Sequence, residues 1–394
     1  MGREGEGREG RGKGRIFIFV RGCGGMKSVD VKTFDGLNVS SKFAICGLPV
    51  RVDTYKTCSF GCRYCFAENR KIMEYEKNLQ VANIDKIKKK MYKIHVCKEY
   101  DSENFLDMLL KGEYTWHCGG MSDPFQPVEQ KYNITRDLIE VSKEYEQSIL
   151  FSTKSDRIYN CKPDQGLHTF QLSVTNTKDR ADIEPNVPPF KSRLKFYRDL
   201  KDDGFRVGIR IQPFIPGVSG EDIIDAFPDA DQFTIEGIKI VPQNEECKKF
   251  VYEELGIPKE DFTQMGLLNL KPEIREKLYE PLIDKLKSMG AKYSIADNDM
   301  HYIGNNMCCC GDNLVSRYTS FNNTAMMQTF GTNYSVIMQE VFLMFSGCSR
   351  CKCNQLFTSN RQEGCVTTVD FFEKRGDRAS SPFSPKFQYI NKKS

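Results

Sequence analysis

The sequence predicts an α/β fold built around a parallel sheet. Short apolar runs alternate with helical patterns from about residue 50 to about residue 295, as in successive βαβ units. About six such units suit a partial or full barrel better than an open sheet, although the pattern alone does not distinguish these architectures. Beyond about residue 305 the alternation stops and Asn, Ser, Thr and Cys become frequent, which indicates a small appendage.

The expected strands are short and rich in β-branched and aromatic residues, which favour an extended backbone. The first leads directly into a cysteine-rich loop, and the last comes shortly before the change of composition. In chain order, we expect strands at 50–56, 114–118, 148–153, 169–174, 206–211, 232–240 and 292–295.

The expected helices are longer, charged segments in which apolar residues recur at helical spacing. They separate the expected strands, as the crossover helices of βαβ units do. They lie at about 84–112, 133–146, 190–203 and 272–289.

Residues 1–25 form a segment of unusual composition. They are mostly Gly, Arg and Glu, and they contribute three of the four net positive charges of the chain. Such a segment cannot build a core, so we expect it to be disordered, with Met26 as the working start. The nearly neutral remainder gives little support for a nucleic-acid partner. We expect three parts: the extension 1–25, a barrel at 26–305 and a Cys-rich appendage at 306–394.

The overall composition is that of a globular protein without a membrane span. Hydrophobic residues make up 39% of the 394-residue chain, within the range of globular domains. The apolar run Ile16–Val20 is too short to cross a bilayer or to act as a secretory signal. We therefore predict a cytoplasmic location and no membrane partner. In that reducing compartment, 16 cysteines indicate metal ligation or thiol chemistry rather than disulfides.

Three of these cysteines share one loop directly after the first expected strand. Cys58, Cys62 and Cys65 are spaced C-x3-C-x2-C, and Gly61 allows the loop to bend tightly. Three thiolates on one loop can bind three corners of a 4Fe–4S cluster, which leaves one iron without a protein ligand. A structural zinc site is the main alternative, but it would need a fourth ligand, and no second cysteine pair at finger spacing follows.

This string, with Tyr64 before the last cysteine, resembles the radical S-adenosylmethionine superfamily. The resemblance implies a partial (β/α)6 barrel of the TIM type, with the cysteine loop after its first strand. It also implies that the open iron binds S-adenosylmethionine, which the reduced cluster cleaves to a 5′-deoxyadenosyl radical. Tyr64 would cover the adenine, and a flavodoxin or ferredoxin would donate the electron.

Strings after the later strands resemble the spore photoproduct lyase-like branch of this superfamily, which is related to DNA repair photolyases. They are Asp123–Glu129 with Thr135 and Arg136, then 153–155, 184–185 and 213–217. The resemblance implies that Gly119 and Gly120 lie against the methionine amine. It implies that the cofactor is also lined by Ser152, Thr153, Lys154, Ser173 and Arg210.

Simpler structural roles compete with these assignments. Glycine pairs are usually turns, and Lys154 could be a solvated surface residue. Asp123 and Glu129 could act as an acid–base pair, but we expect them to cap a helix and to lie in its first turn. We expect His117 to make a local hydrogen bond at a strand end rather than to bind a ligand.

A second group of seven cysteines lies between residues 308 and 365. Four of them could form a zinc site or a second 4Fe–4S cluster, or they could be thiols packed as small apolar groups; they are Cys348, Cys351, Cys353 and Cys365. In the string Cys308–Cys310, Cys309 is our candidate for the hydrogen-atom donor that quenches a product radical. A cysteine has this role in lyases of the branch that the chain resembles.

The function that the sequence predicts is hydrogen abstraction from a substrate by a radical enzyme of lyase-like type. The resemblance favours nucleic-acid repair or modification, whereas the nearly neutral body and the lack of a basic, aromatic string disfavour it. Modification of a peptide or a small molecule is the nearest alternative. A non-enzymatic zinc protein that binds nucleic acid through its C-terminal cysteines is the alternative from another class.

Overall fold

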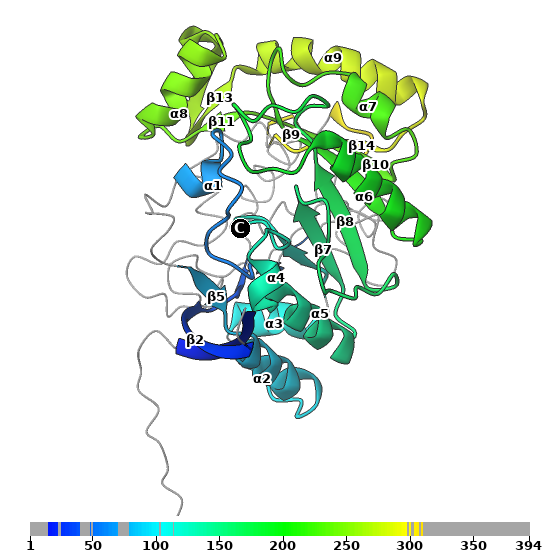
Figure 1. The fold of residues 1–394 in the computed structure, drawn as a ribbon. Coiled ribbons are helices and arrows are strands. Elements are labelled where there is room, and N and C mark those ends of the chain that lie inside the picture. The colour runs from blue at the N-terminus through cyan, green and yellow to red at the C-terminus, as the bar shows by residue number, and fades with distance from the viewer. Residues whose placement is uncertain are drawn as a thin grey trace, which may run out of the picture.

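An eight-stranded sheet forms the centre of the protein (Figure 1). The computed structural model describes residues 15–22, 25–39, 48, 50–69, 79–101, 104–112, 114–297, 299–300, 303–306 and 309. The strands, in the order in which they pair, are β14 (Tyr293–Ile295), β10 (Gln232–Gly237), β9 (Val207–Phe214), β8 (His168–Ser173), β7 (Ile149–Thr153), β6 (Trp116–Cys118), β4 (Val50–Val52) and β3 (Leu37–Val39).

Seven of these strands run parallel, and only the edge strand β3 is antiparallel to its neighbour β4. Each parallel strand overlaps one of the seven strand ranges expected from the sequence. Among the described strands, the two edges β3 and β14 do not pair with each other, so the sheet stays open. The predicted α/β fold with a partial parallel barrel is therefore confirmed, and a full barrel is excluded for the described part of the chain.

The helices connect these strands. They are α1 (Phe66–Asn69), α2 (Ile84–His95), α3 (Phe105–Lys111), α4 (Glu129–Tyr132), α5 (Ile134–Glu144), α6 (Phe190–Asp202), α7 (Asp222–Ala226), α8 (Glu245–Lys249), the π-helical turn η1 (Phe250–Glu254), the 3-10 turn η2 (Lys259–Asp261) and α9 (Pro272–Ser288). None of the helices in the described ranges is both long and apolar enough to cross a membrane.

The single helix expected at 84–112 is two helices, α2 and α3. Helix α2 ends before Lys98, whose backbone has a positive φ of 58° that a helix does not allow. Helix α3 then starts anew, because the Asn104 side chain accepts hydrogen bonds from the backbone N–H groups of Leu106 at 3.0 Å and Asp107 at 3.3 Å.

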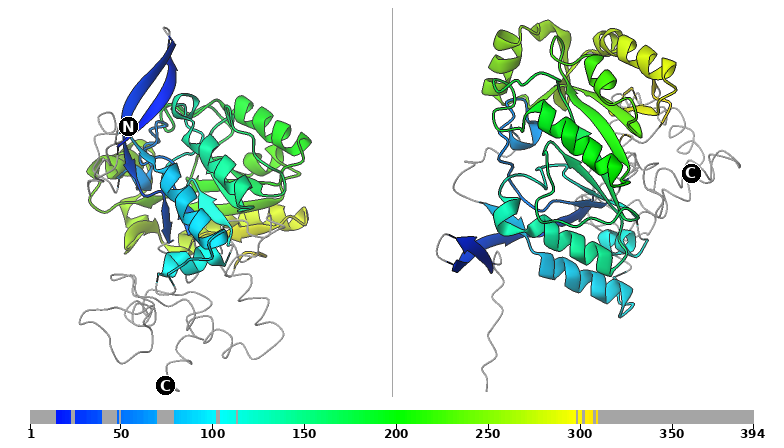
Figure 2. Two further views of the ribbon diagram at one scale, coloured as in Figure 1. Left: turned by 90° about the horizontal axis from the view of Figure 1, so that it is seen from below. Right: turned by 45° about the vertical axis from the view of Figure 1, so that its right-hand side comes forward.

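Two small sheets lie beside the large one. One contains β11 (Lys239–Ile240), β13 (Leu267–Leu270) and β12 (Phe262–Met265), and the other contains β1 (Arg15–Gly22), β2 (Gly25–Phe34) and β5 (Gln80–Ala82). Figure 2 shows β1 and β2 as a blue hairpin. The expectation of disorder throughout 1–25 is therefore wrong for 15–22. The run Ile16–Val20 has high β-propensity and pairs residue by residue with β2.

The two faces of the large sheet differ in polarity. On one face, apolar side chains of the strands pack against α5 and α6 in the main core (Figure 1). Successive side chains of a strand point to opposite faces, so the residues between these core positions lie on the other face. Each of the seven parallel strands has a polar residue there: Arg51, His117, Ser152, Gln171, Arg210, Thr234 and Ser294. Parallel sheets are usually apolar on both faces. This polar face is therefore a candidate position for a functional site.

Candidate cofactor site at the cysteine loop

The three cysteines of the predicted cluster lie in one loop between β4 and α1. This places them at the carboxyl end of a parallel strand, where barrel enzymes hold their reacting groups. Gly61 has a positive φ of 62°, and the Cys65 amide donates to the Cys62 carbonyl at 3.0 Å. The loop is therefore a tight turn that keeps the three side chains on a short stretch of backbone.

Gln126 fixes the first half of this loop. Its side chain is 1% exposed, accepts from the Ser59 amide at 2.8 Å and donates to the Thr57 carbonyl at 2.8 Å. The side-chain amide of Gln126 thus makes the two hydrogen bonds that the backbone of a neighbouring strand would otherwise make with this segment. Gln126, in the string Asp123–Glu129, thus supports the cysteine loop.

The segment 183–186 fixes the loop from the other side. Asn186 donates its backbone N–H to the Phe60 carbonyl at 3.2 Å and its side-chain amide to the Ser59 carbonyl at 3.1 Å. The Arg63 amide donates to the Ile183 carbonyl at 3.0 Å. The loop is therefore held by two segments far apart in sequence, and its conformation does not depend on a bound group alone.

The chemistry of the three side chains fits an iron–sulfur cluster. All three are partly buried and carry thiols. Burial, Glu184 and Cys65 together raise the pKa of Cys62 to about 12, although Lys154 lowers it, and burial raises the pKa of Cys58 well above its usual value. No three His, Cys, Asp or Glu side chains in the described ranges gather closely enough to hold one metal ion.

A fourth thiol, Cys247 of α8, lies close enough to Cys65 to interact with it electrostatically. Burial raises the pKa of Cys247 to about 11, and Cys65 raises it further. The side chain is 2% exposed and belongs to an apolar cluster that also contains Tyr64 and Phe250. This proximity cannot be predicted from the sequence, because no other cysteine lies near Cys247 in the chain. Its packing among apolar groups is that of a structural thiol.

Beside the loop, Glu184 is the centre of a buried group of charges. Its carboxylate accepts from the Tyr64 hydroxyl and from Thr175 Oγ1 at 3.2 Å. Lys154 Nζ lies 3.1 Å and Arg193 NH2 4.0 Å from the same carboxylate. Lys154 and Arg193 thus share the Glu184 carboxylate, and Asp123, a second buried carboxylate, interacts electrostatically with both Lys154 and Cys58. Sequence analysis named Tyr64 and Lys154 but gave Glu184 no role.

Lys154 is therefore not a solvated surface residue. Its ammonium also lies 5.5 Å from the centre of the Tyr64 ring, so the lysine and the tyrosine predicted for the cofactor do meet. The predicted Ser173 contributes its carbonyl, which accepts from Arg193 at 3.1 Å.

Next to this group, Asn176 carries a buried amide without a partner. The residue is 3% exposed, yet neither its Oδ1 nor its Nδ2 has a hydrogen-bond partner among the described residues. An unsatisfied buried amide costs about 1–3 kcal/mol, which a bound molecule with a donor and an acceptor would recover. Sequence analysis did not single out Asn176, although it lies in the polar string that follows β8.

The carboxylates Asp123 and Glu129 have structural roles: Glu129 lies in the first turn of α4 as expected, whereas Asp123 does not cap a helix. Asp123 accepts from the amides of Phe125 at 2.9 Å and Lys154 at 2.6 Å, and from Thr153 Oγ1 at 2.7 Å. Glu129 accepts from the Thr135 and Arg136 amides at 3.0 Å each, which caps α5. The predicted Thr153 therefore supports the loop after β6.

The predicted glycines lie in a close packing contact between strands. Gly119 has a φ of 99°, and a Cβ there would lie 2.1 Å from the Ser152 carbonyl oxygen. A Cβ at Gly120 would lie 3.2 Å from Cδ of Arg51. Gly119 is thus required by the approach of β6 to β7.

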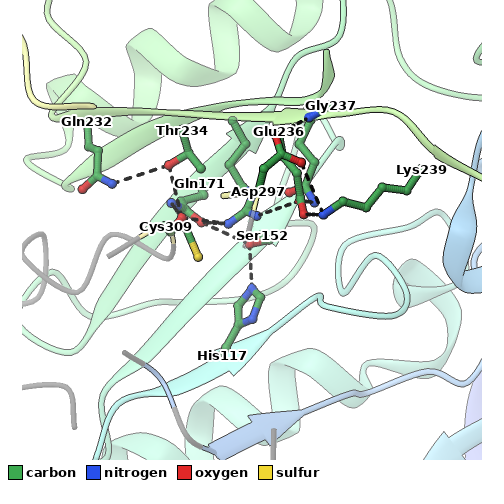
Figure 3. A network of polar contacts seen from close by, with 12 residues as sticks. His117, Ser152, Gln171, Gln232, Thr234, Glu236, Gly237, Lys239, Asp297 and Cys309 are labelled. Atoms are coloured by element: carbon green, nitrogen blue, oxygen red, sulfur yellow. Dashed lines mark hydrogen bonds and ion pairs between the residues drawn. The ribbon is translucent and has the colours of Figure 1, made fainter. Parts of the chain in front are cut away.

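A chain of hydrogen bonds crosses the polar face of the sheet (Figure 3). His117 Nε2 lies 2.9 Å from Ser152 Oγ, and Ser152 Oγ donates to Gln171 at 3.4 Å. Arg210 donates to Gln171 at 3.0 Å. Burial, Arg210 and Arg51 lower the pKa of His117 to about 3, so its imidazole is neutral. Ser152 and Arg210, predicted for the cofactor, belong to this network, and His117 makes the local hydrogen bond expected of it.

Cys309 reaches the same network through its backbone. Its carbonyl accepts from Arg210 at 3.1 Å, Thr234 at 3.2 Å and Gln171 at 3.4 Å, and its side chain packs near Leu48 and Leu150 (Figure 3). The described part of the predicted appendage consists of 306 and 309 only. The other predicted metal ligands lie outside the described residues: Cys348, Cys351, Cys353 and Cys365.

The network continues to a buried group of opposite charges at the ends of β10 and β14. Gln212 links Arg210 to Glu236, which pairs with Lys239. Asp297 accepts from the Gly237 amide at 3.1 Å and from Tyr279 at 2.8 Å. These contacts join the middle of the polar face to its carboxyl-end rim.

No protein-family model matches this sequence. An uncharacterized protein of Methanocaldococcus jannaschii is 24% identical over 199 residues, which are 44% of this chain and 61% of that protein. An uncharacterized protein of Acidianus two-tailed virus is 23% identical over 169 residues, which are 40% of this chain and 54% of that protein. The chain thus spans less than two thirds of both curated relatives.

Two of the solved structures that align with this chain do so over about two thirds of its length. Spore photoproduct lyase complexed with a dinucleoside spore photoproduct aligns over 66% of this chain and 78% of its own, at 14% identity and a TM-score of 0.48. Streptococcus suis SuiB bound to S-adenosylmethionine aligns over 65% of this chain and 52% of its own, at 13% identity and a TM-score of 0.39.

Proposed function

We propose that this chain is a radical S-adenosylmethionine enzyme of lyase-like type. The observation that carries the proposal is the loop of three thiols at the carboxyl end of β4, beside a buried group of paired charges around Glu184. Cys58, Cys62 and Cys65 would hold a 4Fe–4S cluster. When bound there, the reduced cluster with S-adenosylmethionine supplies a carbon-centred radical that abstracts hydrogen from a substrate.

The residues beside the loop suit the polar groups of S-adenosylmethionine. Lys154 and Arg193 are two buried cations beside the loop, and charge-assisted hydrogen bonds from either one suit a carboxylate. The side-chain amide of Asn176 has no hydrogen-bond partner among the described residues. Its N–H group can donate to one hydroxyl of S-adenosylmethionine, and its oxygen can accept from a neighbouring hydroxyl. Tyr64 is held by Glu184 and Thr175, which fixes its ring next to the cysteines.

The polar face supports a polar substrate, with nucleic acid as the proposed class and a peptide or a small molecule as the alternative. His117, Gln171 and Arg210 present a neutral ring, an amide and a guanidinium. We also propose Cys309 as the hydrogen-atom donor, because its backbone is held on this face by three hydrogen bonds. A flavodoxin or ferredoxin would supply the electron, and a second iron–sulfur cluster or zinc at the C-terminal cysteines remains part of the proposal.

The test is anaerobic reconstitution with iron and sulfide, followed by dithionite reduction with S-adenosylmethionine. Wild type should bind about four iron atoms per chain at the loop and release 5′-deoxyadenosine. Cys62→Ala should lose both properties, whereas Cys247→Ala, the matched control with a nearby thiol, should retain them. Colourless wild-type protein that contains zinc and no iron would support the zinc protein instead and overturn the proposal.

A further inference from the structure

Arg63 lies in the middle of the cysteine loop, between Cys62 and Tyr64, and makes three kinds of side-chain contact outside it. Its guanidinium donates to both carboxylate oxygens of Glu254, at 2.6 and 2.7 Å. It lies 4.2 Å from the centre of the Phe250 ring. It also donates to the Asp182 carbonyl at 3.3 Å.

Both side-chain partners come from the π-helical turn η1, which begins at Phe250 and ends at Glu254. Residues four apart in a helix share one face, so the ring and the carboxylate lie side by side toward the loop. Phe250 is 1% exposed and packs in the same apolar cluster as Tyr64. π-helical turns are rare and frequently lie at functional sites. The conformation of η1 is therefore consistent with a functional role for its contacts with Arg63.

An exposed ion pair alone would have little influence on the loop. The side chains of Arg63 and Glu254 are 30% and 44% exposed, and such pairs are screened by water and salt. Here the bidentate pair is combined with a ring contact and with the backbone hydrogen bond from Arg63 to Ile183. Side chain and backbone of one residue are thus held on two different segments.

We propose that Arg63 is a positioning residue that orients the thiols of Cys62 and Cys65 toward a common bound group. The inference rests on the proposed function for the identity of that group, but the clamp itself is a property of the chain without it. Held by Phe250 and Glu254, Arg63 limits rotation of the loop between the two cysteines. Without this clamp the loop would open more often, and the two thiols would be reached more often by reagents in solution.

The test measures thiol alkylation in full-length, metal-free protein under reducing conditions. Rates of iodoacetamide modification at each cysteine are read by peptide mass spectrometry, with the exposed Cys97 as internal standard. Arg63→Gln should raise the rates at Cys62 and Cys65 about tenfold relative to Cys97, the scale expected for loss of a ring contact and a bidentate pair. Arg63→Lys, which can keep the ring contact but not the bidentate pair, should give an intermediate rate.

Arg157→Gln is the matched control, because Arg157 donates to both carboxylate oxygens of Asp156, at 2.8 and 3.1 Å, and lies 5.8 Å from the centre of the Tyr159 ring, away from the contacts of Arg63. It should leave both rates unchanged, and thermal melts of all variants should coincide with that of wild type. The inference is overturned if Arg63→Gln leaves the two rates unchanged, or if all cysteines and the melting temperature change together. This assay contains no iron, so its outcome is independent of cluster binding. The inference on Arg63 can be wrong while wild type still binds a cluster, and it can be right while wild type binds none.

Discussion

Two buried carboxylates beside the cysteine loop, Glu184 and Asp123, have pKa values that are shifted in opposite directions. Burial alone would raise both. At Glu184, Lys154 and Arg193 outweigh burial and lower the pKa. At Asp123, burial outweighs the hydrogen bonds that it accepts and raises the pKa from 3.8 to about 6. Glu184 is therefore a stable anion at neutral pH, whereas Asp123 changes its charge at a pH of about 6, close to neutrality.

The raised pKa of Asp123 predicts a measurable pH dependence of stability. A carboxyl whose folded pKa is raised contributes stability below its unfolded pKa of 3.8, and this is lost as the pH rises through about 6. We expect the free energy of unfolding of wild type, minus that of Asp123→Asn, to be about 2 kcal/mol larger at pH 4 than at pH 7. Urea denaturation at both pH values measures this difference. Parallel pH profiles of the two proteins would contradict it.

Gly119 predicts a large effect of adding one methyl group. In Gly119→Ala the Cβ would meet the Ser152 carbonyl at 2.1 Å, with the backbone at a φ of 99°. We expect a loss of about 3 kcal/mol or more in the free energy of unfolding.

Gly217→Ala is the control for this substitution. It also has a positive φ, of 73°, but a Cβ there meets nothing within 4 Å, so it should cost only about 1 kcal/mol. Equal losses in urea denaturation would show that the approach of β6 to β7 is not what requires Gly119.

At the scale of elements, the sequence predicted the strands better than the ends of the helices. The seven parallel strands stood out because β-branched runs are bounded by polar or turn residues. The interruption between α2 and α3 was missed because a positive φ at Lys98 is not visible in hydrophobic periodicity. The hairpin at 15–22 was missed because the Gly, Arg and Glu around Ile16–Val20 dominated the composition.

The loop after β6 supports the cysteine loop through the side chain of Gln126. Gln126→Ala would leave the Ser59 N–H and the Thr57 carbonyl without their present partner. We expect a loss of about 2 kcal/mol in the free energy of unfolding, together with a lower iron content after reconstitution. Denaturation and iron analysis measure both.

Gln130→Ala, in the same region but exposed, is the control and should match wild type in both measurements. Reduced stability with a full iron content would mean that the cysteine loop does not depend on this contact.

At the scale of the whole molecule, the two faces of the large sheet have different roles. The apolar face builds the core against α5 and α6, and the polar face carries a network from His117 to Asp297 (Figure 3). Sequence analysis found the cysteine loop because its ligands are close together in the chain. It could not find Asn176, Cys247 or the π-helical turn, because they approach the loop only through the fold.

The most direct measurement is electron paramagnetic resonance of the anaerobically reduced protein, recorded with and without S-adenosylmethionine. If the three thiols leave one iron of a cubane open, the reduced protein gives a 4Fe–4S signal whose g values change when S-adenosylmethionine is added. A spectrum that stays the same at saturating S-adenosylmethionine would mean that no iron is accessible to this molecule. That result would contradict the account at its centre.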